Sequence, residues 1–347
     1  MVGVTLRNVS KHYGAVRALD DVSLTVAPGE LVALLGSSGC GKTTLLRSVA
    51  GLEQPDQGQI LINEADVTST PTRLRPIGMV FQSYALFPNM TVRQNIAFPL
   101  VVRKRPTSEI QPRVAELLKL VHLADQAERY PNQISGGQQQ RAALARALAP
   151  DPQVLLLDEP LSALDALVRT QLRDEIRRIQ QAVNITTLYV THDQAEAMAI
   201  ADRVAVMNRG KIEQIATPPE IYDAPATRFS ATFVGNRNAL ELSVQNGRLR
   251  LGQAFDLTPP AGAQRALLFF RPEDVEFSTN DHGENATIES KSFLGAQTRL
   301  HLMLEADNQI ARFYADLPSR QALALGLGDV VKVQIAEANV RIFPADE

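Results

Sequence analysis

The sequence predicts an α/β domain followed by a smaller all-β domain, and three observations support this. Two uninterrupted apolar runs, Leu31–Leu35 and Val154–Leu157, are typical of strands buried on both faces of a sheet. A segment with helical periodicity follows each run. From about Asn236, short alternating strands recur, separated by turns rich in Gly, Asn and Asp. With 347 residues the chain is long enough for both domains, which we place at 1–235 and 236–347.

The composition excludes several classes of protein. The net charge is only −3 and there is no basic stripe, so nucleic acid is not expected as the main partner. The single cysteine, Cys40, cannot form an intrachain disulfide, and this favours the cytosol. The N-terminus lacks the apolar core of a signal peptide. A membrane span is not expected either, because Asp158 and Glu159 interrupt the most apolar stretch.

Residues 2–30 alternate between apolar and polar side chains until the turn Pro28-Gly29. This pattern predicts an antiparallel β-layer that leads into the first buried strand. Tyr13 lies in a polar turn of this layer, in a chain that has few aromatic residues. Its ring is suited to stacking on an adenine base, and an ordinary half-buried tyrosine is an equally good explanation.

The stretch after the first buried strand carries the most specific motif. It fits G-x-x-x-x-G-K-[ST] between a strand and a helix that begins near Lys42. Glycines let backbone N–H groups turn toward phosphate oxygens, and the helix adds the positive end of its dipole. Lys42 supplies a charge for the β- and γ-phosphates, and Thr43 supplies a hydroxyl for Mg²⁺. The motif therefore predicts a nucleoside triphosphate site rather than a glycine-rich turn with a surface lysine. The expected contacts are Gly36, Ser37, Ser38, Gly39, Cys40, Gly41, Lys42, Thr43 and Thr44.

The segment that follows combines a strand, an irregular stretch and helical sequence. A short apolar run from Ile77 ends at Gln82. The residues Leu86-Phe87-Pro88 then form an apolar cluster within Ser83–Met90, which suggests either a partner site or a small core under a loop. Helical spacing predicts helix over Val92–Leu120. We expect a helical subdomain over about 84–150.

A second candidate phosphate cradle precedes an alanine-rich helix. Here the small-residue turn Ile134–Gln138 opens the helix, so its N–H groups and the helix dipole are available to an anion. A plain helix cap is the commoner use of such a turn. If both cradles bind phosphate, either both face one nucleotide or two chains each supply half of a site.

Polar residues follow two of the predicted buried strands. Asp158 and Glu159 end the second apolar run, and His192 follows the strand Thr187–Val190. The carboxyl ends of parallel strands share one sheet edge, where one carboxylate can hold Mg²⁺ and the other can reach a water molecule. A helix start is the weaker explanation for the acidic pair, and a core position is the weaker one for His192. Ser162–Asp165 lies between these strands.

Taken together, these motifs resemble the ATPase subunit of ABC transporters. The family's Walker A motif matches 36–43, its signature 134–138, its Walker B motif 154–159 and its D-loop 162–165. Its Q-loop matches Gln82, its switch histidine His192 and its A-loop aromatic Tyr13. The resemblance implies a P-loop NTPase fold with a RecA-like core, an antiparallel β-subdomain and a helical subdomain. Residues 236–347, with FRPEDVEF at 270–277, more loosely resemble the OB-like (TOBE) regulatory domain of certain importers.

The resemblance also implies a mechanism in which two chains pack head to tail. The signature loop of one chain covers the γ-phosphate held by Lys42 of the other, and Asp165 lies at the dimer contact. Arg129 also reaches across, unless it is a solvated arginine. ATP and Mg²⁺ are the implied ligands, with Tyr13 and Gln82 joining the phosphate loop at ATP. The implied signature residues are Ser135, Gly136, Gly137 and Gln138; the catalytic residues are Lys42, Gln82, Glu159 and His192; the Mg²⁺ ligands are Thr43, Gln82 and Asp158.

The implied partners are a second copy of the chain, transmembrane permease subunits and, indirectly, a solute-binding protein. The implied location is the cytoplasmic face of the inner membrane, as a peripheral subunit. Importers with such a β-domain carry polyamines, ferric iron, sulfate or sugars. The general look of the C-terminal domain and the segment SALDALVR at 162–169 favour ferric iron or polyamine, with sulfate or sugars as the alternative cargo. A non-transport ABC ATPase is the remaining alternative.

Overall fold

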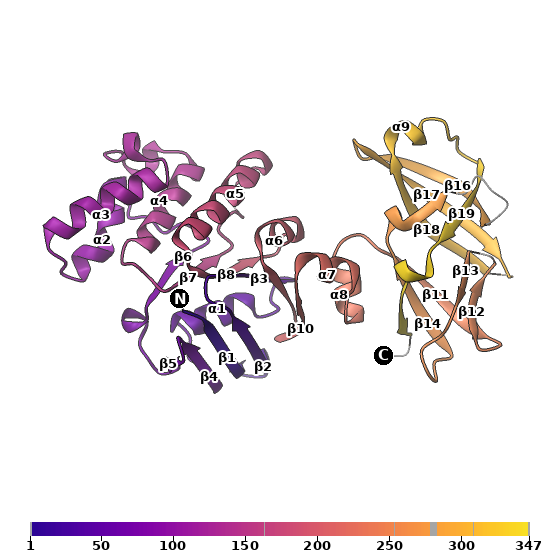
Figure 1. Ribbon diagram of the computed structural model, residues 1–347, viewed down its shortest axis with the longest axis horizontal. Helices are drawn as coiled ribbons and strands as arrows, with labels where there is room; N and C mark the ends of the chain where they lie inside the picture. The colour runs from indigo at the N-terminus through magenta and orange to yellow at the C-terminus, as the bar shows by residue number, and fades with distance from the viewer. Residues whose placement is uncertain (1, 163, 253, 278–282, 308, 346–347) are drawn as a thin grey trace. The chain divides into compact units, whose positions relative to one another are not determined.

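The computed structural model describes the chain except residues 1, 163, 253, 278–282, 308 and 346–347 (Figure 1). Ala163, part of the predicted D-loop, therefore lies outside the described residues. The chain divides into two compact units, Met1–Ile221 and Tyr222–Glu347, and each is described separately. Among the described residues, none of the helices combines the length and apolar character that a membrane crossing requires.

The first unit is built on a six-stranded sheet in the order β10-β9-β3-β8-β7-β6. Neighbouring strands are parallel from β9 to β6, and β10 is antiparallel to β9. Strands β9 and β10 thus form a hairpin. The strands are β3 (Leu31–Gly36), β6 (Ile77–Val80), β7 (Val154–Asp158), β8 (Thr186–Thr191), β9 (Arg203–Asn208) and β10 (Lys211–Ala216).

The central strands β3 and β7 are largely apolar because the sheet has a separate core on each face. In β7, Val154 and Leu156 belong to one core and Leu155 and Leu157 to the other. The first core lies between the sheet, helix α1 (Lys42–Ala50) and a four-stranded antiparallel sheet, which confirms the predicted N-terminal β-layer. That layer has the order β2-β1-β4-β5 and consists of β1 (Val4–Tyr13), β2 (Val16–Val26), β4 (Gln57–Ile62) and β5 (Ala65–Asp66).

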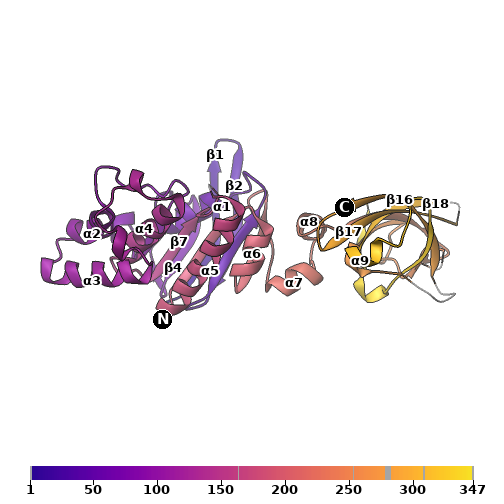
Figure 2. The ribbon, with the colours of Figure 1, turned by 90° about the horizontal axis from the view of Figure 1, so that it is seen from above.

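Helices cover the other face of the central sheet, and α5 and α6 lie side by side there (Figure 2). The helix predicted over 92–120 is wrong in one respect, because two helices occupy this range. The helical conformation is interrupted at Lys104, which has a left-handed φ of 55°, and Pro106 precedes the second helix. The helices are α2 (Val92–Val102), α3 (Thr107–Leu120), α4 (Gly136–Leu148), α5 (Ala166–Val183) and α6 (Gln194–Ile200).

The second unit is mostly β, as predicted, and its two five-stranded sheets enclose one core. One sheet has the order β13-β12-β11-β14-β20, with β11 (Asn238–Gln245), β12 (Arg248–Leu251), β13 (Phe255–Leu257), β14 (Arg265–Phe270) and β20 (Arg341–Pro344). The other has the order β15-β19-β16-β17-β18, with β15 (Val275–Phe277), β16 (Glu284–Phe293), β17 (Gln297–Ala306), β18 (Gln309–Pro318) and β19 (Val330–Ile335). Short helices are α7 (Pro218–Asp223), at the division between the units, α8 (Arg228–Phe233) and α9 (Ser319–Ala322).

Candidate nucleotide site

The phosphate loop connects β3 to α1 and leaves the helix N-terminus without a side-chain cap. Gly41 occupies the N-cap position with φ of 108°, and its missing side chain is essential. A Cβ atom there would lie 2.3 Å from the carbonyl oxygen of Ala18, which is too close for any other residue. The helix also has no acidic residue in its first turn. Its N-terminal amides are therefore free to face an anion.

The Lys42 ammonium lies across this loop. It donates to the carbonyl oxygens of Gly36 at 2.8 Å and Ser37 at 2.9 Å. The buried Cys40 thiol lies 3.7 Å from the same nitrogen, and the Cys40 carbonyl accepts a bond from the Gly210 amide at 3.0 Å. The β9–β10 turn therefore fixes the loop from behind. The charge is held near the loop before any phosphate arrives.

The carboxyl edge of β7 lies against the start of α1. Thr43 Oγ1 donates to Asp158 Oδ1 at 3.3 Å. Burial raises the pKa of the Asp158 carboxyl, while the Arg47 guanidinium and the Thr43 hydroxyl oppose that rise. The sequence analysis did not identify Arg47 as a site residue. Its position one helical turn after Thr43 puts both side chains on one face of α1, and this spacing could have indicated it. A hydroxyl and a carboxylate are thus held together where Mg²⁺ was predicted.

Glu159 comes directly after β7 in a left-handed conformation with φ of 43°. Such a φ is uncommon for glutamate and turns the side chain out of the strand's alternation. Its Oε2 lies 3.1 Å from Nε2 of Gln82 and 3.3 Å from Nδ1 of His192. Three residues singled out from separate parts of the sequence therefore meet at one carboxylate oxygen. Two of them, Gln82 and His192, border a hollow of about 690 Å³ that is also lined by Arg47, Phe81, Ser83, Asp158 and Ser162.

The signature segment forms the start of α4 and is capped by its own residues. Ser135 Oγ accepts from the Gln138 amide at 3.3 Å, and Gln138 Oε1 accepts from the Ser135 amide at 2.9 Å. A Cβ atom on Gly136 would lie 3.2 Å from Leu164 in the turn before α5. In the described part of the chain, no hydrogen bond joins this segment to the phosphate loop. The two candidate cradles are thus separate features of one chain.

The remaining predicted residues lie on the surface. The Tyr13 ring is 47% exposed, with Lys11 Nζ 5.5 Å from its centre, so one face remains available for stacking. Arg129 is exposed. Asp165 caps α5, accepting from the Val168 amide at 3.0 Å. Ser38 and Gly39 are exposed at the tip of the phosphate loop, and Thr44 is half-buried. Their predicted roles toward ATP or a second chain stay predictions.

Glu196, on α6 behind His192, is the most perturbed acid near this site. It is only 6% exposed, and both carboxylate oxygens accept hydroxyl bonds from β8, one from Tyr189 and one from Thr191 at 2.7 Å. Burial raises the pKa of Glu196 to about 7, with Arg169 and Arg173 opposing the rise. Glu196 was not among the predicted site residues, because an Asp-x-x-Glu spacing such as that from Asp193 to Glu196 is typical of a helix cap and does not indicate a buried network.

We expect the Glu196→Gln variant to remove a pH dependence of stability. Because the pKa is raised on folding, protonation of Glu196 favours the folded state, and this contribution is lost as the pH rises through about 7. Between about pH 5 and about pH 8.5 the wild-type chain should lose about 1–3 kcal/mol of unfolding free energy relative to the glutamine variant. Urea unfolding at both pH values measures this. If the unfolding free energies of the wild-type chain and of the Glu196→Gln variant changed with pH by the same amount, this prediction would be contradicted.

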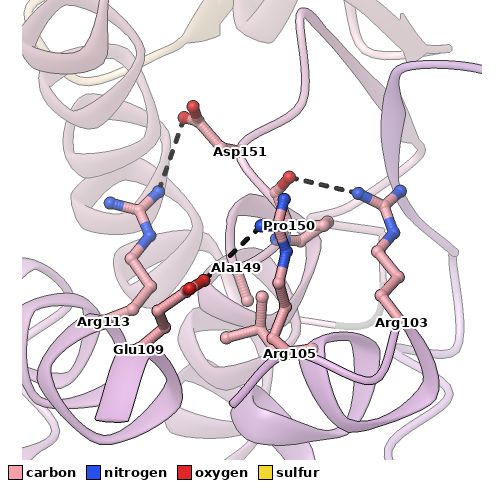
Figure 3. A pocket seen from close by; sticks show the side chains of 8 residues that line it. Arg103, Arg105, Glu109, Arg113, Ala149, Pro150 and Asp151 are labelled. Atoms are coloured by element: carbon pink, nitrogen blue, oxygen red, sulfur yellow. Dashed lines mark hydrogen bonds and ion pairs between the residues drawn. The ribbon is translucent and has the colours of Figure 1, made fainter.

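Two further hollows lie away from the nucleotide residues. An apolar groove of about 570 Å³ is bordered by Leu52, Phe87, Phe98 and Val102. A pocket of about 340 Å³ shares Arg103 and Pro150 with it. As Figure 3 shows, the arginines of this pocket are engaged: Arg103 with the Pro150 carbonyl, Arg105 with Glu109 and Arg113 with Asp151. None of the predicted nucleotide residues lines either hollow.

The predicted apolar cluster at 86–88 combines the two explanations that the sequence left open. Leu86 packs against the core on the helical face of the sheet. Phe87 packs on Phe98, with ring centres 4.5 Å apart, and lines the apolar groove. Arg146 holds the segment by donating to the carbonyl oxygens of Tyr84 and Ala85. One side chain thus belongs to the core and its neighbour to a surface groove.

Comparison with known proteins shows the family. A family model for the ABC transporter matches residues 19–162, and one for the TOBE domain matches 268–343. The chain is 50% identical over 311 residues to the sulfate/thiosulfate import ATP-binding protein CysA of Thermosynechococcus vestitus, with 89% of each chain covered. It is 52% identical to the protein of that name from Caulobacter vibrioides, covering 85% of this chain and 88% of the relative. For Synechococcus elongatus the identity is 48%, with 99% of this chain and 97% of the relative covered.

A solved structure supports the same family assignment for the first unit. The dimeric structure of MJ0796, a bacterial ABC transporter cassette, matches with a TM-score of 0.56 and 33% identity, covering 62% of this chain and 98% of that one. The family models and the curated relatives extend the match over the β-rich unit as well. This chain therefore belongs to the ATP-binding subunits of ABC transporters that carry a TOBE domain, and it is the ATPase of an importer.

Proposed function

We propose that this ATPase works as a head-to-tail homodimer at the cytoplasmic face of the inner membrane and drives import of sulfate or thiosulfate. The observation that carries the cargo is the match to sulfate/thiosulfate import proteins at 46–52% identity over 85–99% of the chain in several bacteria. The match includes the β-rich unit as well as the ATPase unit. It therefore supports a shared cargo more strongly than a match to the ATPase unit alone would.

The relatives favour this cargo over the ferric iron or polyamine that the sequence suggested. That preference rested partly on the segment SALDALVR, which the structure places in the turn before α5 and in its first turn. There Asp165 serves as the helix cap and Arg169 contacts neighbouring turns. These contacts lie within the ATPase unit, so the pattern of the segment is a poor guide to the transported solute.

The geometry supports a division of roles in ATP hydrolysis. Lys42 and the free amides of α1 hold the phosphates, as their position around the loop allows. Glu159 polarises the attacking water, and its Oε2 is oriented by Gln82 and His192. His192 then also contacts the γ-phosphate. Positioning and charge stabilisation are enough for phosphoryl transfer, since the protein needs no covalent step.

The residues at the β7 edge fit a magnesium ion. Thr43 and Asp158 present oxygen atoms 3.3 Å apart, and Gln82 borders the same hollow as Asp158. Among the described residues no cluster of three or more His, Cys, Asp or Glu could hold a metal alone. Mg²⁺ suits such a site, because it takes one or two protein ligands together with substrate phosphates and water. When bound it neutralises charge on the phosphate oxygens.

A head-to-tail dimer explains why one chain has two phosphate cradles. Among the described residues no hydrogen bond joins the signature turn to the phosphate loop of its own chain, and the similar MJ0796 structure is dimeric. The capping box leaves the Ser135 hydroxyl proton free to donate, because Oγ serves there as an acceptor. Ser135, Gly136, Gly137 and Gln138 would cover the nucleotide of the second chain, with Asp165 at the contact and Arg129 within reach.

The apolar groove is the proposed seat of the permease. It is lined mainly by apolar side chains, among them the exposed Val102 on α2, and it is bordered by Arg103. An amphipathic helix of a partner can bury its apolar face in such a groove. The groove includes Phe87, from the apolar cluster that the sequence left open as a partner site or a small core.

We expect Val102→Asp to uncouple transport from hydrolysis. Val102 is 62% exposed in the groove, so a charge there is tolerated by the free subunit and not by a permease helix. Transport should fall by about 10-fold or more, while ATP hydrolysis by the free subunit stays unchanged. Val101→Asp is the matched control, since Val101 is 57% exposed on the same helix but does not line the groove. Equal losses in both variants would contradict the docking surface.

Reconstitution tests the cargo. The tagged chain is purified from membranes with its permease, placed in liposomes with ATP inside, and supplied with the associated solute-binding protein. Uptake of radiolabelled sulfate that thiosulfate competes away, and that the Glu159→Gln variant lacks, is the expected result. ATP-driven uptake of ferric iron, a polyamine or a sugar without sulfate uptake would overturn the cargo. Recovery of the chain without any permease would overturn the transport function.

A further inference from the structure

The turn that carries His192 is held from behind by a buried hydrogen-bond network. Thr191 Oγ1 accepts from the Asp193 amide at 3.0 Å and donates to Glu196 at 2.7 Å. Asp193 Oδ1 in turn accepts from the Glu196 amide at 3.0 Å and so caps α6. The residues on both sides of His192 are therefore fixed to α6. The position of His192 depends on where this turn and helix lie.

Arg169 ties this turn to the one that follows Glu159. Its Nη1 lies 3.3 Å from Asp193 Oδ2, and its Nη2 donates to the carbonyl oxygen of Leu164 at 3.0 Å. One planar guanidinium, on the first turns of α5, thus bridges the two turns. Leu164 belongs to the segment Ser162–Asp165, whose last residue is exposed. The side chain of Leu164 also lies beside Gly136 of the signature helix.

The bridge closes a ring that contains the proposed catalytic pair. Ser162 donates from its amide and its hydroxyl to the carbonyl oxygen of Glu159, at 3.3 and 3.0 Å. His192 Nδ1 lies 3.3 Å from Glu159 Oε2 on the opposite side. The ring therefore runs from Glu159 through the Ser162–Asp165 turn and Arg169 to Asp193, and returns through His192. A shift of the Ser162–Asp165 turn would move Arg169 and, through Asp193, His192. The geometry between His192 and Glu159 would change as a result.

We propose that Arg169 is a positioning residue that transmits the position of the Ser162–Asp165 turn to His192. This inference rests on the proposed function, in which that turn contacts a second chain. Packing of the second chain against Asp165 then holds Arg169 and Asp193 in place and sets His192 against Glu159. Hydrolysis is in this way made dependent on assembly of the complete dimer, and Arg169 acts through Asp193 and His192.

A double-mutant cycle tests the bridge. Arg169→Gln removes the charge, and Asp193→Asn removes its partner while keeping a good helix cap. We expect each variant to lower kcat by about 10-fold or more, because small misplacements of reacting groups slow catalysis strongly. KM for ATP should stay within about twofold, since the phosphate loop is untouched. The double variant should be no slower than either single one, and Arg169→Lys should recover part of kcat.

Arg173→Gln is the matched control. Arg173 lies one turn later on the same helix. Its charge also acts on the pKa of Glu196, but its guanidinium pairs with the exposed Asp174 at 2.7 Å and not with either of the bridged turns. This variant should hydrolyse ATP at the wild-type rate. The inference is overturned if Arg169→Gln is no slower than the control, or if the losses of the two single variants multiply in the double variant. An inactive wild-type chain would instead overturn the proposed function, and the inference with it.

Discussion

Replacing Glu159 by glutamine should stop ATP turnover and leave ATP binding intact. The amide has nearly the same shape and can still meet Gln82 and His192, which lie 3.1 and 3.3 Å from the carboxylate. It cannot act as a base toward water, however, so kcat should fall about 10²–10³-fold. Phosphate release measures turnover, and a fluorescent ATP analogue measures binding at the phosphate loop.

Glu116→Gln is a suitable control for this variant. Glu116 pairs with Arg113 on α3, with 64% of its side chain exposed, and lies outside the nucleotide hollow. Its replacement should change neither binding nor turnover. If Glu159→Gln released phosphate at a rate near that of the control, another group would have to polarise the water. If both binding and turnover were lost, Glu159 would matter for the fold of the site rather than for the reaction.

Mixed dimers should regain activity that neither parent chain possesses. Lys42→Met removes the ammonium from the phosphate loop, and Ser135→Asp places a carboxylate where the signature would face the γ-phosphate of the second chain. Aspartate caps a helix as well as serine does, so α4 should remain folded. Each homodimer should be nearly inactive. A heterodimer has one site with both residues intact and should reach up to about half of the wild-type rate.

The two chains are co-expressed with different tags and purified through both tags in succession. Wild-type heterodimers prepared in the same way give the reference rate. Activity no higher than that of the two parent homodimers would show that Lys42 and Ser135 act at a site within one chain. The experiment thus tests the head-to-tail arrangement separately from the role of Glu159.

The sequence was informative where function depends on residues close together in the chain. The phosphate loop is recognisable because the turn, the lysine and the helix start are all local features, and Gly41 must be glycine for a steric reason visible at one position. The meeting of Gln82, Glu159 and His192 could be anticipated in outline, since each follows a buried parallel strand. The left-handed φ of Glu159 could not.

Features that depend on tertiary contacts were not predictable. Glu196 was not predicted as a site residue, because its hydrogen bonds to Tyr189 and Thr191 of β8 form only in the folded chain. The helix break after Val102 depends on a left-handed Lys104, a conformation that no lysine signals in sequence. Leu86 and Phe87 are adjacent and apolar, yet one packs in the core and the other lines a groove. Which of two adjacent apolar side chains is buried depends on the elements that pack on each side of the chain.

The partition of the central sheet between two cores bears on how such a subunit can diverge. Leu155 and Leu157 pack with α2 and α4, which contribute to the proposed permease groove, whereas Val154 and Leu156 pack on the side of α1 and the phosphate loop. Substitutions that reshape the helical layer disturb mainly one of these cores. On the proposed docking arrangement, the helices beside the groove can change to fit another partner while the residues of the nucleotide site are kept.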